Sequence, residues 1–193
     1  MIELSKITGR LGNQLFLFAF AYNYARQCGI DRYFQDPIYF RESEGEIKFI
    51  LQQGIPERTD MVAIHYRQGD YVNNPLYTNL SETSYYDDAM ALFPDEDFLV
   101  FSDDIEKAKE FFIGKQFYFS EGRNEIDDFN LMASCKHQII ANSSFSLWCG
   151  ILNPNPNKKV ICPQEDKYYS DGVIRTKYPD YFTQLNFNDN CIK

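Results

Sequence analysis

DDFNLMASCKHQIIANSSFSLWCGILN, residues 127–153, is the stretch of sequence that decides the fold. Its first part favours a helix at about 127–135, and the apolar run QIIA at 138–141 favours a buried strand. The polar pair of serines and the apolar residues behind it favour a second helix at about 144–152. Helix, strand and helix in close succession are typical of an α/β protein.

The same alternation continues on both sides of this stretch. The sequence predicts further strands at 61–66 (MVAIHY), 98–102 (FLVFS), 116–120 (QFYFS) and 159–162 (KVIC), and further helices at about 82–93 and 104–112. Strands that alternate with helices predict a parallel sheet covered on both faces. Ser81, Asp103, and either Asn142 or Ser143 stand where helix N-caps are expected.

The start of the chain shows a different pattern. Residues 2–8 (IELSKIT) predict a strand, and Gly9 and Gly12 predict a tight turn into a helix that runs from about Asn13 to Gln27. Two glycines in this turn permit a close approach of the backbone to a ligand. A plain strand-turn-helix connection capped by Asn13 explains the same residues equally well.

The segment between residues 31 and 60 has weak periodicity and indicates irregular structure or short strands. We therefore expect a boundary near Ile55–Asp60. It divides the chain into a reduced N-terminal half at 1–59 and a Rossmann-like α/β domain at 60–193.

Composition restricts the class of protein. Hydrophobic residues make up 44% of the 193 residues, which supplies a packed core and excludes a disordered chain. The 19 Lys and Arg face 28 Asp and Glu, so the net charge of −9 argues against a nucleic-acid clamp. Any anion that this protein binds must therefore be held by a local group of residues.

Cysteines and apolar runs restrict the location. Five scattered cysteines without a CxxC pair indicate reduced thiols rather than a disulfide framework or a zinc site. The longest apolar run, at residues 15–22, is well short of the roughly 20 residues that span a bilayer. With no secretory signal evident, we expect a cytoplasmic protein without a transmembrane segment.

Polar residues stand at the ends of three predicted strands. Arg67 follows MVAIHY. Ser102 is the last residue of FLVFS, and Asp103 follows it. Ser143 and Ser144 come after QIIA. Ligands of open α/β sheets bind at the carboxyl ends of the strands. The amide groups at a helix start and the Arg67 guanidinium are both suited to a phosphate or diphosphate.

Two further residues are candidates for binding a nucleobase. Asp128, near the start of a predicted helix, has a carboxylate that suits the N–H donors of guanine, and His65 has a ring that suits a base or ribose. Each has a simpler explanation, as a helix N-terminal carboxylate and as a sheet-edge histidine. Asp70 is more readily explained as a carboxylate that orients Arg67 than as a ligand contact.

Metal chemistry has little support in the sequence. The triplet Asp95-Glu96-Asp97 matches the Asp-x-Asp element of some glycosyltransferases, but it precedes the strand at 98–102 and is expected at the wrong end of the sheet. The two histidines are too few and too far apart in the chain for a histidine-rich site. We therefore expect no metal.

Four motifs together carry a family resemblance. GRLGNQLFLFAFA (9–21), HYRQGDYV (65–72), FLVFSDDIE (98–106) and the stretch at 127–153 resemble, in order, motifs of the α-1,2-fucosyltransferases of glycosyltransferase family 11. The resemblance covers almost the whole chain except about 31–60 and the extreme C-terminus.

The resemblance implies a GT-B-like fold and an inverting, metal-independent transfer of L-fucose from GDP-fucose to a glycan hydroxyl, with an α-1,2 linkage and no cofactor. It assigns residues as follows: Arg67 to the β-phosphate, His65 and Asp128 to guanine, Ser143, Ser144 and Phe145 to the phosphates, and Asn13 to the phosphate-sugar junction. Ser102 and Asp103 complete the expected donor site.

Two departures from the family pattern leave alternatives open. Gln68 replaces a second arginine, and the span from GRLGNQ to HYRQGD is much shorter than in typical members. The acceptor side is therefore minimal, borrows a surface from a second copy of the chain, or is too reduced for catalysis. A GDP-sugar-binding protein without transferase activity and a transferase for another nucleotide sugar are the rival hypotheses.

Overall fold

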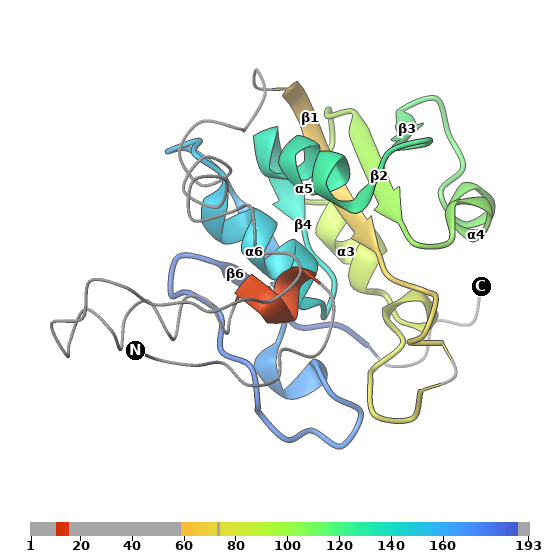
Figure 1. Ribbon diagram of the computed structural model, residues 1–193. Helices are drawn as coiled ribbons and strands as arrows, with labels where there is room; N and C mark the ends of the chain where they lie inside the picture. Colours follow the sequence, from red (N-terminus) through yellow and green to blue (C-terminus); the bar gives the residue numbers. More distant parts are fainter. Residues whose placement is uncertain (1–10, 16–58, 73, 189–193) are drawn as a thin grey trace, which may run out of the picture. The chain divides into compact units, whose positions relative to one another are not determined.

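The computed structural model describes residues 11–15, 59–72 and 74–188 (Figure 1). The chain divides into two units, Met1–Ile55 and Pro56–Lys193. The second unit contains all the described strands and the helices α3 to α6.

Most predictions for the first unit lie outside the described residues. This applies to the strand expected at 2–8 and to the irregular segment that follows residue 30, up to residue 58. Residues 11–15 are helical, so a helix is confirmed here, but its predicted start at Asn13 is wrong because Leu11 and Gly12 already belong to it; Asn13 is exposed. The remainder of that helix is outside the described part of the chain.

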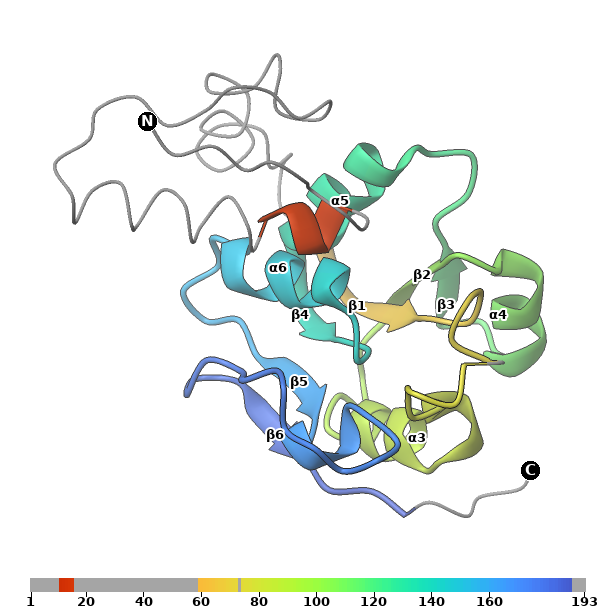
Figure 2. The same ribbon diagram turned by 60° about the horizontal axis from the view of Figure 1, so that its bottom comes forward.

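The described residues form a six-stranded sheet in which every pair of neighbours is parallel. Its strands are β1 Thr59–Tyr66, β2 Phe98–Ser102, β3 Phe117–Phe119, β4 Cys135–Ile139, β5 Val160–Pro163 and β6 Thr183–Leu185. Their order across the sheet is β3-β2-β1-β4-β5-β6, which Figure 2 shows from one side. This is the order of the Rossmann fold, so the predicted Rossmann-like parallel sheet is confirmed.

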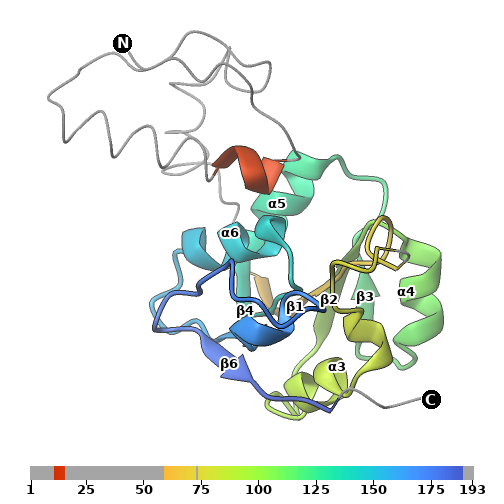
Figure 3. The same ribbon diagram turned by 90° about the horizontal axis from the view of Figure 1, so that it is seen from below.

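Helices cover both faces of the sheet. They are α3 Tyr85–Met90, α4 Ile105–Phe111, α5 Glu125–Ser134 and α6 Ser144–Leu152, with short 3-10 turns η1 at Leu80–Glu82 and η2 at Glu165–Lys167. Residues of α3 and α4 share one core cluster with alternate residues of β1 and β2. Figure 3 shows α5 and α6 on the opposite side of the sheet from α3.

β4 shows how the two faces differ. Ile139 belongs to the core that contains α3 and α4. The side chain of its neighbour Gln138 points the other way, and its amide donates to the backbone oxygens of Met132 in α5 and Cys149 in α6, at 2.9 and 3.3 Å. A buried glutamine is tolerated here because its donor group is hydrogen-bonded.

The predicted helix at 82–93 is wrong in extent. The structure has η1 and the shorter α3 in its place, with Ser84 at the N-cap position of α3. The hydroxyl of Thr83 donates to the oxygen of Leu80 at 2.8 Å and accepts from the amide of Tyr85 at 3.2 Å. These local bonds compete with a continuous helical ladder between the two segments.

Two predicted caps are also wrong. Asn79 rather than Ser81 caps the first turn, because the Asn79 side chain accepts from the Ser81 amide at 3.3 Å. Asp104 rather than Asp103 caps α4, and it accepts from the Lys107 amide at 3.2 Å. The carboxylate of Asp103 is unavailable for capping because it is engaged at the end of β1.

The strand predicted at 138–141 begins earlier, at Cys135, and ends at Ile139. α5 ends at Ser134, so the chain enters the sheet without a loop. Lys136 and His137 are polar, and a search for apolar runs therefore misses the first half of this strand. The helix predicted at 144–152 is confirmed residue for residue.

We expect Tyr85→Phe to destabilise the protein by about 1–2 kcal/mol, because its buried hydroxyl donates to two carbonyl oxygens, of which that of Ile161 keeps another donor, the Ile140 amide at 2.9 Å. These are the oxygens of Ile140 at 2.6 Å and Ile161 at 3.1 Å. Urea unfolding measures the change. Tyr118→Phe is the matched control because Tyr118 is 49% exposed, and equal stability of both variants would contradict the expectation.

Candidate nucleotide-sugar site

The strand order creates a topological switch point beside the end of β1. β1 and β4 are neighbours, but the chain leaves β1 toward β2 and leaves β4 toward β5. The loops that follow the two strands therefore diverge to opposite sides, which is where open α/β sheets bind their ligands. Arg67 follows β1 and Ser143 follows β4, so two of the predicted binding residues flank this point.

Arg67 is held by a carboxylate from the neighbouring strand. Its Nη1 lies 2.7 Å from Oδ2 of Asp103, which follows β2, and its side chain is 10% exposed. The other oxygen of Asp103 accepts from the backbone N–H of Gln68 at 2.9 Å. Asp103 thus fixes both the guanidinium and the backbone that carries it, so two predicted donor-site residues meet directly.

Gly69 makes this arrangement sterically possible. A Cβ atom at residue 69 would overlap the carboxylate of Asp103. That carboxylate cannot move aside without losing its bonds to Arg67 and Gln68. The close approach of the two loops therefore requires glycine at this position.

Asp70 also pairs with Arg67, at Nη2. The prediction that Asp70 orients the arginine is therefore supported by a direct contact. The two carboxylates differ in burial, since Asp70 is 68% exposed and Asp103 is 16% exposed. Asp103 is the fixed partner, and Asp70 is the partner that an incoming anion can replace at low cost.

His65 and Phe145 come together on the face that α5 and α6 cover. Their ring centroids are 5.4 Å apart, and Phe145 contacts Phe129 of α5 edge-on at 5.5 Å. His65 is buried, and its backbone oxygen accepts from the hydroxyl of Tyr86 at 2.9 Å. The structure thus brings two predicted ligand residues from β1 and α6 into contact.

The start of α6 has the properties of an anion site. Ser143 occupies the N-cap position, and its side chain forms no capping bond. The first amides of the helix have no acceptor within it, and the helix dipole is positive at this end. The neighbouring Asn142 is structural, because its side-chain amide donates to the oxygens of Thr78 and Tyr168, at 2.9 Å each.

Asp128 forms a separate polar group at the end of β3. Its Oδ1 accepts from the hydroxyl of Ser120 at 2.5 Å, and Nη1 of Arg123 donates to that same hydroxyl at 3.0 Å. Burial raises the pKa of the Asp128 carboxyl, and the Ser120 bond and Arg123 oppose this effect. The sequence analysis did not identify Ser120 or Arg123, although both stand shortly before Asp128 in the sequence, between β3 and α5.

Two other predicted residues have different surroundings. The hydroxyl of Ser102 donates to the oxygen of Asp104 and accepts from its amide, both at 3.0 Å, so it closes a local turn. Asn13 belongs to the first unit, and the described geometry around Arg67 belongs to the second.

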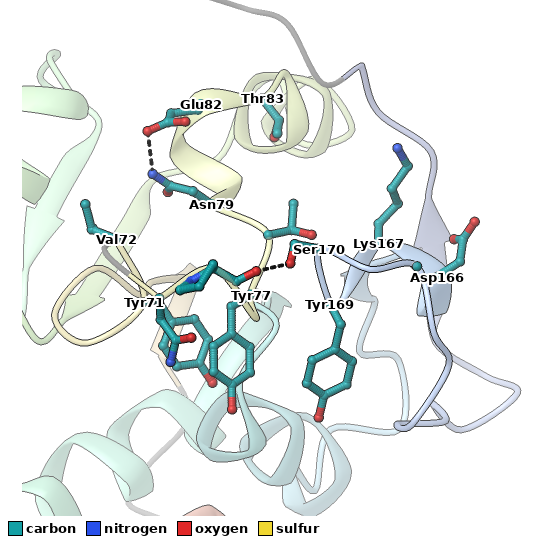
Figure 4. A pocket seen from close by; sticks show the side chains of 14 residues that line it. Tyr71, Val72, Tyr77, Asn79, Glu82, Thr83, Asp166, Lys167, Tyr169 and Ser170 are labelled. Carbon is teal, nitrogen blue, oxygen red and sulfur yellow. Dashed lines mark hydrogen bonds between the residues drawn. The ribbon is translucent and has the colours of Figure 1, made fainter.

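Three tyrosines that the sequence analysis did not identify lie beside Arg67. The Arg67 guanidinium lies over the ring of Tyr71, 5.0 Å from its centroid, and Tyr71 stacks on Tyr77 at 4.0 Å. Figure 4 shows Tyr71, Tyr77 and Tyr169 in a row. They line a cavity of about 660 Å³, with Asn79 and other polar residues on its opposite side. Their scatter along the sequence hid this cluster.

No group suited to a metal ion occurs among the described residues. Asp97 directly precedes β2, so the acidic triplet lies at the amino end of the sheet as predicted. Glu96 pairs instead with Lys136. No helix within the described ranges has the length and apolar character needed to cross a membrane.

Comparison with known proteins identifies the family of this chain. The sequence model of Glycosyl transferase family 11 matches residues 41–178, which include every residue described around Arg67. The chain belongs to this family. No solved structure gives a significant match.

Two curated relatives of this family 11 chain come from Escherichia coli. The chain is 32% identical over 127 residues to the O-antigen biosynthesis glycosyltransferase WbnK. This alignment covers 60% of this chain and 42% of the relative. It is 39% identical over 102 residues to an alpha-1,2-colitosyltransferase. This second alignment covers 47% of this chain and 35% of the relative. The matched part spans less than half the length of either relative.

We expect Asp103→Ala to lower the stability of this family 11 chain by about 2 kcal/mol, because it leaves a buried guanidinium and a backbone N–H without their acceptor. Asp70→Ala is the matched control and should cost at most about 1 kcal/mol, as exposed ion pairs do. Urea unfolding at pH 7 measures both. A larger loss for Asp70→Ala than for Asp103→Ala would reverse the assigned roles.

Asp128→Asn should stabilise the protein at pH 7. A carboxyl whose pKa is raised by folding favours the folded state at low pH, and that contribution is lost as the pH rises through the folded-state pKa. Asparagine does not undergo this loss. The advantage should shrink as the pH is lowered toward the carboxyl pKa, which urea unfolding at several pH values measures, and a destabilised variant at pH 7 would disprove it.

Proposed function

We propose that this chain carries the donor site of a glycosyltransferase that moves L-fucose from GDP-fucose to a glycan hydroxyl. In this proposal the linkage is α-1,2, the anomeric configuration is inverted and no metal is used. The observation that carries the proposal is the Arg67 guanidinium, fixed by Asp103 beside the switch point between β1 and β4. The Rossmann-like unit would be the donor half of a GT-B fold.

The geometry suits a diphosphate leaving group. In a transfer, the acceptor oxygen attacks the anomeric carbon, the bond from that carbon to the phosphate oxygen breaks, and GDP leaves with the electron pair. Negative charge grows on the diphosphate in the transition state. Arg67 and the amides at the start of α6 are placed before the reaction to stabilise such charge, which is the effect that most often dominates catalysis.

Fixing Arg67 before binding has an energetic consequence. The guanidinium is already held at Nη1 by Asp103, so little side-chain entropy is lost when a phosphate binds. The exposed Asp70 occupies Nη2 and would be exchanged for a phosphate oxygen. One negative group replaces another, so the arginine keeps a partner throughout the cycle.

Base recognition is assigned to His65 and Asp128. The Asp128 carboxylate is oriented by Ser120, and guanine offers it two N–H donors on one edge. His65 packs against Phe145 at the start of α6. The general base that accepts the proton of the acceptor hydroxyl has no assignment, and Asn13 remains a proposed contact at the phosphate-sugar junction.

One of the relatives supports a second candidate. The name of the alpha-1,2-colitosyltransferase gives the same linkage with a different sugar. A phosphate site does not distinguish the sugar it carries. The rival function is therefore the transfer of a different sugar from its nucleotide to form the same linkage. The name of this relative is the observation that favours it.

Gln68 bears on the remaining alternative, a GDP-sugar-binding protein without activity. Its side chain is buried and its amide donates to the oxygen of Arg67 at 3.3 Å. The position that holds a second arginine in the family motif therefore brings no charge to the site here. Leaving-group stabilisation then depends on Arg67 and the helix amides.

Arg67→Ala should reduce fucose transfer from GDP-fucose by about 100-fold to 1,000-fold, as the loss of a preorganised donor does. Transfer is measured as GDP release and labelled product over a panel of glycan acceptors, with circular dichroism as the check on folding. Lys107→Ala is the matched control, since it removes an exposed cation that pairs with Asp104. Turnover like that of the wild type in Arg67→Ala would refute the role.

Competition among GDP-fucose, GDP-mannose and UDP-sugars separates the candidates. The proposal expects guanine nucleotides to bind best, and Asp128→Asn to reduce that preference. Tighter binding of UDP-sugars would contradict it. Binding of GDP without transfer to any acceptor would favour the binding protein instead.

A further inference from the structure

Five side chains beside the candidate site form a continuous stack. The guanidinium of Arg67 lies over Tyr71, and the rings of Tyr71 and Tyr77 are parallel to within 8° at 4.0 Å. Tyr77 in turn stacks on Tyr169 at 5.5 Å, with 30° between the planes. Arg175 closes the far end, 4.8 Å from the centroid of Tyr169. The stack thus has an arginine at each end and three tyrosines between them.

The stack joins two loops at the carboxyl ends of β1 and β5. Tyr77 and Tyr169 form an antiparallel bridge through their backbones. The amide of Ser170 donates to the oxygen of Leu76 at 3.0 Å, and its hydroxyl donates to the oxygen of Pro75. These backbone bonds hold the rings in register, as Figure 4 shows for the labelled tyrosines and Ser170.

The far end of the stack is also held in place. The two terminal nitrogens of Arg175 donate to the two carboxylate oxygens of Asp171, at 2.9 and 2.7 Å. This paired contact keeps the guanidinium plane over Tyr169. The stack of rings next to Arg67 therefore extends from the loop after β1 to the loop after β5.

Tyr71 contributes a contact that the carboxylates cannot. Asp103 and Asp70 bind the terminal nitrogens of Arg67 at the edge of its guanidinium. An edge contact leaves the plane free to tilt about the line between the two acceptors. The central carbon of the guanidinium lies over the Tyr71 ring, 5.0 Å from its centroid, and cation–π attraction resists a tilt that would carry the cation away from the ring.

Tyr71 stays neutral in this position. Burial raises the pKa of its hydroxyl well above the ordinary value, with a smaller contribution from Tyr77, while Arg67 lowers it. The arginine therefore faces an uncharged aromatic ring at any working pH. Nε of Arg67 is buried and has no hydrogen-bond partner among the described residues. Its N–H group is therefore a suitable spectroscopic probe of the neighbouring Tyr71 ring.

We propose that Tyr71 is a positioning residue for Arg67, and that Tyr77 and Tyr169 support it by connecting it to the loop after β5. The proposal rests on the proposed function, because it concerns the orientation of the arginine that would stabilise the departing diphosphate. Tyr71 itself acts through Arg67 and not on the reacting atoms.

Kinetics of three variants test this role in the full chain. Tyr71→Leu removes the aromatic face and should lower kcat about fivefold to tenfold with a smaller change in KM, whereas Tyr71→Phe keeps the face and should retain kcat. In an Arg67→Lys background, which has no planar group to orient, Tyr71→Leu should cause little further loss. Tyr181→Leu is the matched control, because it removes a surface ring that lies under Lys158 at 5.4 Å.

Three kinetic results would overturn the proposal. They are an unchanged kcat in Tyr71→Leu, equal losses in Tyr71→Leu and Tyr71→Phe, and a full loss from Tyr71→Leu in the Arg67→Lys background. Where Tyr71→Leu does not fold, Tyr77→Leu replaces it. That variant keeps the Arg67–Tyr71 contact and removes its support, so it should lower kcat by a smaller factor, and an unchanged kcat would overturn the supporting role.

A spectroscopic test separates this proposal from the proposed function, because it needs no substrate. The Nε–H signal of Arg67 in nuclear magnetic resonance, identified by its loss in Arg67→Lys, should carry a ring-current shift. The shift should persist in Tyr71→Phe and disappear in Tyr71→Leu. A chain that transfers no sugar but shows this pattern would refute the function and leave the positioning intact, whereas an identical signal in Tyr71→Leu would refute the positioning.

Discussion

The pairing of β1 with β2 on one side and β4 on the other is the constraint on which the rest of the site depends. β1 and β4 are the two central strands in this order, and the chain reverses its direction of travel across the sheet between them. That reversal makes the carboxyl ends of β1 and β4 a topological switch point, with Arg67 after one strand and the start of α6 after the other. The parallel register also brings His65 level with Phe101 on β2, so that Asp103 emerges beside Arg67.

Three charged side chains meet at the carboxyl ends of β1 and β2. A chain with a net charge of −9 binds an anion only where local groups overcome the general field. Here Asp103 fixes an arginine from behind, Asp70 covers it from the solvent side, and Tyr71 supports its face. Two acidic residues therefore position the Arg67 guanidinium at the switch point.

Particular residues show where prediction from sequence succeeded. The strand at 98–102 and the helix at 144–152 were predicted with their observed bounds, because apolar runs and helix starts are local signals. The start of β4 was missed because Lys136 and His137 are polar. The cap of α4 was misplaced because Asp103 is drawn away by Gln68 and Arg67, which are distant in the chain.

The sequence by itself determined the alternation of strands and helices, the family, and the polar residues at the strand ends. It did so because periodicity and motifs depend only on neighbouring residues. Tertiary structure alone decided the strand order, the partner of Asp103 and the stack of Tyr71, Tyr77 and Tyr169. These contacts join residues up to 92 positions apart, and their energies depend on distances that exist only once the sheet has formed.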